Sequence, residues 1–199
     1  STQGVSSAAS DVYKRQGCAP AQKPLTDYVN PMLGTATLWD SVDLGFKPTK
    51  RTWGAEVFPG SSLPNAMVQV SPVTKFHSGA GYQYEDSVIY GFTHTNKGHW
   101  NLCHIPLLPV TGTPTPGDYC SPFSHERESA APGYYQVFLD RYGVDAQLSS
   151  TLRCAFHKYT YPAGAAASLL ADLQRSNEHV RAWDTVSYTH LRAHETLMN

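Results

Sequence analysis

The 199-residue sequence contains no apolar run near the roughly 18–20 residues that span a bilayer as a helix. Charged residues are scarce, at 16% of the chain, and nearly balanced, with a formal net charge of −1. No basic stripe is available to neutralise phosphate groups, which argues against binding to nucleic acid. We therefore expect neither a transmembrane segment nor a nucleic-acid partner.

Cysteine is also rare, and the spacing of the cysteines does not favour a metal site. The four cysteines include no C-x-x-C pair, which argues against a zinc ribbon or a thioredoxin-like motif. Cys18 follows Gly17 and precedes APAQKP, and this stretch is similar to the end of a bacterial lipoprotein signal with its short tether. An acylated Cys18 is one interpretation and an ordinary tail cysteine is the other.

Neither end of the chain is expected to belong to the fold. Residues 6–16 (SSAASDVYKRQ) resemble translated sequencing-adapter DNA, and residues 186–196 (VSYTHLRAHET) resemble the reverse complement of the partner adapter. A natural disordered tail is the alternative. The expected organisation is non-native tails at 1–16 and 186–199, a lipoprotein tether at 17–24 and a partial β domain at 25–185.

No segment shows a sustained helical period, and no internal repeat of about 20–50 residues is visible. Fourteen prolines and 15 glycines divide the chain into short apolar segments. Asp140–Gly143 predicts a hairpin connection, because glycine readily adopts positive φ. Closely spaced strands with frequent turns predict an all-β fold, an antiparallel β-sandwich. The expected strands are Ala66–Ser71, Val88–Thr93, Ile105–Val110, Tyr135–Leu139, Val144–Arg153 and Cys154–Tyr161, while Ala166–Leu173 fits a helix or a buried strand.

Seven short motifs follow one another between about Leu25 and Asp172. Each motif alone is unspecific. They are YVNPMLGT, FPGSSLP with MVQVSP, GYQY, IYGFTHT, FSHE, APGYY, and TLR with HKYTY. Their order and spacing together resemble the N-terminal domain of glycoside hydrolase family 92, the calcium-dependent α-mannosidases.

The resemblance implies a β-sandwich that packs on an all-helical (α/α) barrel absent from this chain. It also implies inverting hydrolysis of α-mannosidic bonds in glycans by an exo-acting enzyme. In that reaction a carboxylic acid protonates the leaving oxygen and a carboxylate activates water. Family members use Ca²⁺, which prefers oxygen ligands, to hold the sugar. The acid, the base and the calcium ligands are all expected in the barrel. No catalytic or metal-ligating residue is therefore assigned here, and the chain alone is expected to be inactive.

The loop from Thr93 to His104 is the best candidate for contact with sugar. It is rich in hydrogen-bonding groups and carries one large aromatic side chain, which could stack on a sugar face. In the family, the corresponding loop helps to shape the leaving-group subsite. The candidate substrate-binding residues are Trp100, His94, His99, Asn101 and Cys103, with Trp53 and Glu56 as secondary candidates.

Two other interpretations of this loop stay open. Trp100 could be a core anchor, with the histidines on solvated faces of the loop. His94, His99, Cys103 and His104 could also be taken for zinc ligands, but no helix or knuckle geometry supports that interpretation.

The sequence departs from the family pattern at two positions. Asn96 stands where the second histidine of the IxGFSHTH motif is expected, which leaves the linkage preference open. Ala66 stands where the family has glycine, and its Cβ argues against close approach of that turn to a sugar. Glu126 and Glu128 suggest a carboxylate pair, but on an exposed strand or loop we expect both to be solvated.

Three functions are compatible with the sequence. The leading one is a fragment of an α-mannosidase of the bacterial periplasm or outer cell surface, anchored through Cys18 if that residue is acylated. The second is a stand-alone carbohydrate-binding β-sandwich module of the envelope, and the third is a structural envelope lipoprotein. The first predicts very weak mannoside binding by this chain, the second measurable binding and the third none.

Overall fold

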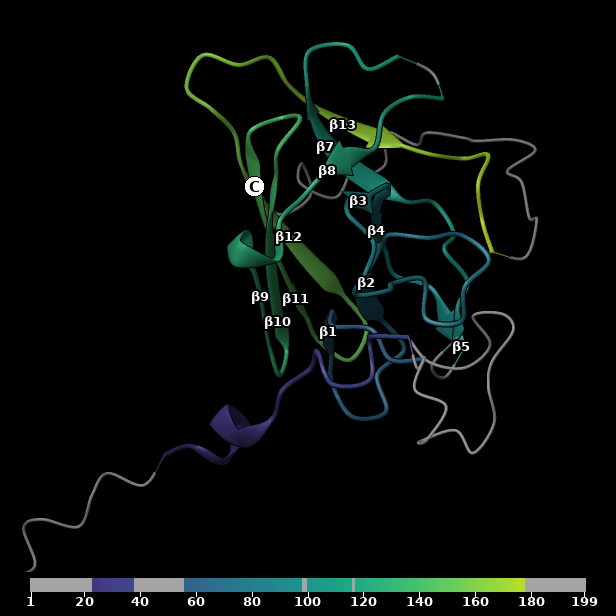
Figure 1. Cartoon of the computed structure of the whole chain (residues 1–199), viewed down its shortest axis with the longest axis vertical. Helices are drawn as coiled ribbons and strands as arrows, with labels where there is room; N and C mark the ends of the chain where they lie inside the picture. The colour runs from purple at the N-terminus through teal and green to yellow at the C-terminus, as the bar shows by residue number, and fades with distance from the viewer. Residues whose placement is uncertain (1–22, 38–55, 98–99, 116, 178–199) are drawn as a thin grey trace, which may run out of the picture.

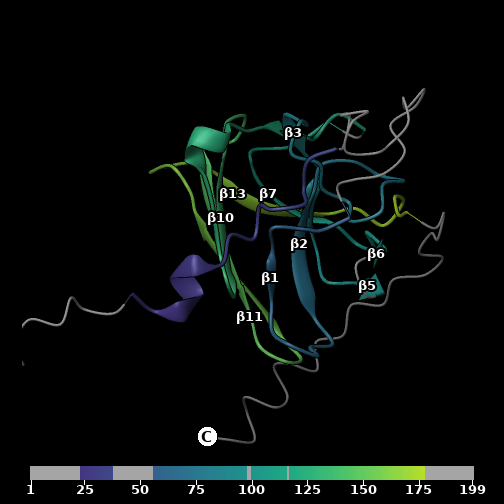
Figure 2. The ribbon, with the colours of Figure 1, turned by 60° about the horizontal axis from the view of Figure 1, so that its bottom comes forward.

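The computed structural model describes residues 23–37, 56–97, 100–115 and 117–177. Within these ranges the chain is nearly all β, and two antiparallel sheets face each other as a sandwich (Figures 1 and 2). Trp53, His99 and Cys18 lie outside the described residues, as do both predicted tails. No helix in the described ranges is long and apolar enough to cross a membrane.

The first sheet has five strands in the order β1-β2-β4-β7-β13. Each strand pairs antiparallel with its neighbours. The last strand along the chain lies at one edge, beside β7. The bounds are β1 Ser61–Ser62, β2 Gln69–Val73, β4 Gly91–Thr93, β7 Leu107–Thr111 and β13 Ala167–Ala171.

The second sheet has four strands in the order β12-β11-β10-β9, so each strand pairs with its neighbour in the sequence. Buried and partly exposed residues alternate strictly along β10 and β11, as expected for strands with one face on the core. The bounds are β9 Glu128–Ala131, β10 Tyr134–Leu139, β11 Val144–Ser150 and β12 Ala155–Thr160.

The predicted hairpin at Asp140–Gly143 is confirmed. Leu139 pairs with Val144, and the four residues between them form the connection. Gly143 has a φ of 64°, and its backbone N–H donates to the carbonyl of Leu139 at 2.8 Å. Glycine at this position therefore supplies the left-handed residue that closes the turn.

The bounds of β2, β7 and β11 differ by a few residues from those predicted, and one predicted strand is divided in the structure. Val88–Thr93 forms two short strands, because the chain leaves one partner at Tyr90 and joins the five-stranded sheet at Gly91. A Cβ on Gly91 would lie 2.9 Å from the Cβ of Pro106, so only glycine allows this close approach of β4 and β7. The ambiguous segment Ala166–Leu173 contains a strand, β13, which pairs with β7.

The core lies between the two sheets. Alternate side chains of β10 and β11 meet apolar side chains from β2, β4 and β7. Most are completely buried, so the sandwich holds its shape through apolar contact between the sheets. Core members are Val70, Phe92, Leu108, Val110, Val137, Leu139, Val144, Ala146 and Leu148.

The remaining elements are short. Two two-stranded ladders lie beside the sandwich, and the described residues also contain two short 3₁₀ helices. They are β3 Val88–Ile89 with β8 Ser121–Pro122, β5 Asn96–Lys97 with β6 Trp100–Asn101, η1 Leu25–Tyr28 and η2 His125–Arg127.

Candidate functional site

The loop singled out from the sequence folds back on itself as a small hairpin of β5 and β6. Asn96 pairs with Asn101, and Lys97 pairs with Trp100. The hairpin lies on the side of the five-stranded sheet away from β9 and β10 (Figures 1 and 2). The Trp100 side chain is 40% exposed, so it does not serve as a core anchor. Its indole is available at the surface.

Trp100 has two neighbours that shape this surface. A Cβ built on Gly79 would lie 3.8 Å from Cζ3 of Trp100 and 4.0 Å from Cγ of Glu56. The indole and the Glu56 side chain therefore stand beside the same glycine, where the lack of a side chain leaves room between them. This arrangement brings together two of the candidate residues, and it adds Gly79, which the sequence did not single out.

Asn101 and Cys103 hold the hairpin in place from below. Both are fully buried. The Asn101 Oδ1 accepts hydrogen bonds from Thr93 Oγ1 at 3.1 Å and from the backbone N–H of Cys103 at 2.8 Å. Cys103 has a φ of 52°, which is unfavourable for a residue with a Cβ. The Asn101 side chain stabilises this turn, and burial raises the pKa of the Cys103 thiol to about 12.

Asn177 joins the hairpin to a second loop. Its Nδ2 donates to the carbonyls of Ser78 at 3.0 Å and Asn101 at 2.5 Å, and its backbone N–H donates to the carbonyl of Leu102 at 2.9 Å. Its Oδ1 accepts from the backbone N–H of His77 at 2.5 Å. One buried asparagine side chain therefore fixes the loop that carries Gly79 against the strand that carries Trp100.

His94 follows β4, the strand before the hairpin, and its side chain reaches the other sheet. Its Nε2 lies 2.6 Å from Nε2 of His157, and Nδ1 of His157 lies 2.6 Å from the Tyr159 hydroxyl. Burial lowers the pKa of His94. Burial and then the charge of His94 lower that of His157 to about 4. Of the candidate residues that the structure describes, His94 has a ring nitrogen engaged with another side chain inside the protein.

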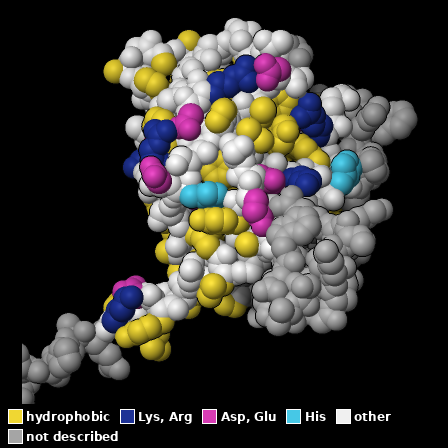
Figure 3. Space-filling model, viewed as in Figure 1, with side chains coloured by type: hydrophobic (Ala, Val, Ile, Leu, Met, Phe, Trp, Pro, Cys, Tyr) yellow, Lys and Arg dark blue, Asp and Glu magenta, His cyan; other side chains and the backbone are white. Residues whose placement is uncertain are grey.

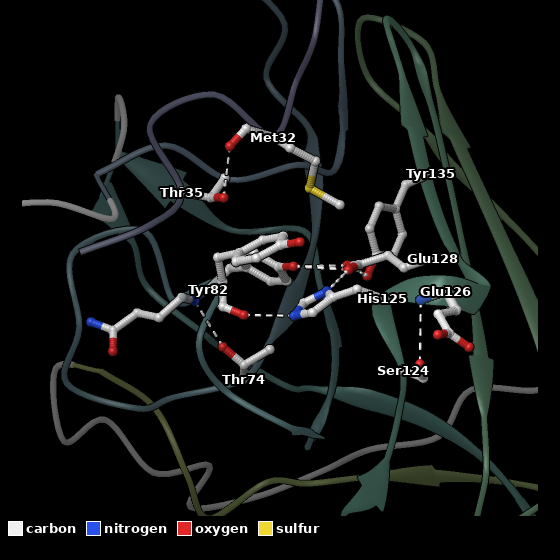
Figure 4. Close-up of polar contacts among 11 residues, drawn as sticks. Met32, Thr35, Thr74, Tyr82, Ser124, His125, Glu126, Glu128 and Tyr135 are labelled. Atoms are coloured by element: carbon white, nitrogen blue, oxygen red, sulfur yellow. Dashed lines mark hydrogen bonds and ion pairs between the residues drawn. The ribbon is translucent and has the colours of Figure 1, made fainter. Parts of the chain in front are cut away.

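Glu128 is buried, which contradicts the expectation of a solvated side chain. Its carboxylate is completely inaccessible and accepts from Tyr82 Oη at 2.9 Å, Tyr135 Oη at 2.6 Å and His125 Nδ1 at 2.5 Å (Figure 4). The expectation was wrong because β9 turns Glu128 into the sandwich, where it meets hydroxyl donors from β10 and from the loop between β2 and β3. Glu126 is exposed, as expected.

The Glu128 cluster connects three parts of the chain. His125 Nε2 lies 2.6 Å from the carbonyl of Tyr84, and the two rings stack with centroids 4.0 Å apart. The backbone N–H of Tyr84 in turn donates to the carbonyl of Thr35 at 3.1 Å. Burial first, and then Glu128, raise the pKa values of Tyr82 and Tyr135. Because three donors already occupy the carboxylate, we assign it a structural role.

The described residues offer no obvious metal centre. Within 23–37, 56–97, 100–115 and 117–177, no group of three or more His, Cys, Asp or Glu side chains could hold an ion. Lys and Arg side chains on the face in Figure 3 are scattered and form no continuous basic stripe.

A β-sandwich with an exposed indole, a carboxylate and a glycine at one surface resembles the β domain of a glycoside hydrolase. Comparison with known proteins identifies the family. Residues 28–196 match the glycosyl hydrolase family 92 N-terminal domain, and the chain belongs to this family. The match extends past residue 185, and the origin of the last residues stays a prediction.

Solved structures of family 92 enzymes are similar to the chain. The GH92 α-mannosidase BT3965 from Bacteroides thetaiotaomicron, solved in complex with mannoimidazole, is 32% identical over 77% of this chain and 20% of its own, with a TM-score of 0.63. The GH92 glycosyl hydrolase ccman5 is 28% identical over 76% of this chain and 21% of its own, with a TM-score of 0.59.

A third solved structure is the inverting GH92 mannosidase BT2199 from Bacteroides thetaiotaomicron. It is 26% identical over 74% of this chain and 19% of its own, with a TM-score of 0.59. The chain thus spans about a fifth of the length of these enzymes. No curated protein matches it.

Proposed function

We propose that this chain is the N-terminal part of an exo-acting α-mannosidase that cleaves α-mannosidic bonds of glycans with inversion. Membership of family 92 supports the proposal, and of the similar solved enzymes one is described as an α-mannosidase and another as an inverting mannosidase. Since the chain spans about a fifth of those enzymes, the catalytic acid and base would lie in the remainder. The chain alone would then be inactive.

The part played by this chain is to supply one wall of the sugar-binding site. The observation that carries this role is the surface made by Trp100, Gly79 and Glu56. An indole covers the apolar C–H face of a pyranose, a carboxylate accepts from its hydroxyl groups, and a glycine leaves space for the ring between them. The two asparagines beneath, Asn101 and Asn177, keep this surface in one geometry.

The calcium ion of the proposed enzyme would take its ligands from the rest of the protein. The residues described here do not fit such an ion, because they contain no cluster of three potential His, Cys, Asp or Glu ligands. We also propose a location in the bacterial periplasm or at the outer cell surface, with Cys18 as the candidate lipid anchor. Conversion of Cys18 to serine should then release the full protein from the membrane fraction.

The decisive experiment is to follow the reading frame beyond Asp184 in the source DNA and to express the complete protein. It should release mannose from an α-mannobiose, and NMR of the first product should show inverted configuration at the anomeric carbon. Trp100→Ala should lower kcat/KM by about 3- to 10-fold, which corresponds to the loss of one stacked aromatic contact. Phe156→Ala is the control, because Phe156 is 60% exposed on β12, in the other sheet.

Binding by the 199-residue chain separates the alternatives. Calorimetric titration with methyl α-mannoside should show very weak binding if most contacts come from the rest of the enzyme. Binding that saturates at low concentration and disappears in Trp100→Ala would instead favour a stand-alone carbohydrate-binding module. A complete protein without α-mannosidase activity would refute the proposed function.

A further inference from the structure

A chain of three side chains runs from the four-stranded sheet to the base of the Trp100 hairpin. Tyr159 and His157 lie two residues apart on β12, and His94 follows β4 in the opposite sheet. The Tyr159 hydroxyl is 2.6 Å from His157 Nδ1, and His157 Nε2 is 2.6 Å from His94 Nε2. The two imidazole rings meet edge to face, with centroids 4.9 Å apart and an angle of 84°.

The distances restrict where the protons of these three side chains can lie. Burial lowers the pKa values of both histidines, so both are neutral at neutral pH and each ring carries one N–H. A separation of 2.6 Å between the two Nε2 atoms requires one of them to donate and the other to accept. The chain can therefore run in one of two directions, and the tautomers of the two rings are coupled.

Tyr159 decides the direction. Burial raises the pKa of its phenol, which stays protonated, and among the described residues His157 Nδ1 is the acceptor within reach of that proton. The opposite direction would leave the phenol proton without a protein partner. Tyr159 therefore donates to His157 Nδ1, and His157 Nε2–H donates to His94 Nε2.

We infer that Tyr159 and His157 are positioning residues that hold His94 as an Nδ1–H donor at the base of the Trp100 hairpin. His94 Nδ1 makes no hydrogen bond with any described residue, so its proton is free for a ligand. An N–H donor selects an oxygen lone pair, which in a glycan is a hydroxyl, ring or glycosidic oxygen. The identity of that ligand rests on the proposed function, whereas the direction of the hydrogen bonds from Tyr159 to His94 does not.

Side-chain ¹⁵N NMR of histidine in the 199-residue chain tests the direction without any sugar. In the wild type we expect protonated Nδ1 and bare Nε2 in His94, and the reverse in His157. Tyr159→Phe removes the donor that fixes the direction, so neither ring should then be held in a single tautomer. Tyr161→Phe is the matched control: its hydroxyl donates to the carbonyl of Ser168 at 2.8 Å, outside the chain, and neither tautomer should change.

Two results would overturn the inference on direction. One is a wild-type His94 protonated at Nε2, and the other is the same pair of tautomers in wild type and Tyr159→Phe. In the complete enzyme, Tyr159→Phe should also lower kcat/KM for a mannobiose by about tenfold while Tyr161→Phe leaves it unchanged. If the tautomers change in Tyr159→Phe but kcat/KM does not fall, His94 does not donate to the substrate and the inferred ligand contact is wrong. Absence of mannosidase activity in the wild type would refute the proposed function alone.

Discussion

Replacement of Glu128 by glutamine should destabilise the sandwich strongly, although the side chain hardly changes in size. The carboxylate accepts from Tyr82, Tyr135 and His125 and is completely buried. In Glu128→Gln one acceptor oxygen becomes an NH₂ group, so at least one of these donors would face another donor. Hydrogen bonds to a charged group contribute about 1.5–3 kcal/mol each, and an unsatisfied buried donor costs about 1–3 kcal/mol.

These values give a loss of about 3 kcal/mol in the free energy of unfolding. For a chain of this length, about 2–4 °C of Tm per kcal/mol converts that loss into a decrease of about 6–12 °C. Urea unfolding and thermal melts followed by circular dichroism would measure both quantities. Glu126→Gln is the control, because Glu126 is exposed only two residues away. If both variants lie within about 0.5 kcal/mol of wild type, the assigned role of Glu128 is refuted.

Three further predictions concern pH, backbone geometry and thiol chemistry. The pKa of His157 falls from 6.5 to about 4 on folding, so between these pH values the unfolded chain binds a proton that the folded chain does not. The free energy of unfolding, measured by urea titration, should therefore be highest above pH 6.5 and decrease by about 2 kcal/mol toward pH 4. In His157→Phe this decrease should be smaller. Gly81→Ala should lower the free energy of unfolding by about 1–2 kcal/mol more than Gly164→Ala. Both glycines have positive φ, but of the two only Gly81 has atoms near the position of a Cβ, the nearest at 2.7 Å. Equal losses in the two variants would contradict this reasoning. A thiol reagent should label the exposed Cys154 in the native chain and reach the buried Cys103 only after denaturation, as mass spectrometry of peptides can show.

The sequence predicted the four-stranded sheet best. The alternation of Tyr135, Val137 and Leu139 and the glycine at 143 depend on neighbours in the sequence, and each determines which face is buried or where the chain turns. The spacing of strands and turns gave the class of fold, and the family motifs added a role for the Trp100 loop. These local signals were sufficient for β10 to β12 because each of these strands pairs with its neighbour along the chain.

Contacts between distant residues could not be predicted in this way. An acidic side chain such as that of Glu128 is expected at the surface. Its burial follows only from the positions of Tyr82 and Tyr135, which donate hydrogen bonds to it. Gly79 and His157 are equally uninformative alone, since their roles depend on Trp100 and His94 from other strands. Sequence patterns report the preferences of a residue, whereas burial and pairing of a polar group depend on tertiary structure.

The hydrogen bonds of Asn177 also set an order of events during synthesis. Each strand of the four-stranded sheet can pair as soon as its neighbour has left the ribosome, because the contacts are local. The Trp100 surface differs, since Asn177 bonds to residues 100 positions earlier, at His77. That surface can be completed only after nearly all of the described chain has emerged. A nascent chain released before residue 177 would therefore carry an assembled four-stranded sheet but a loosely held Trp100 hairpin.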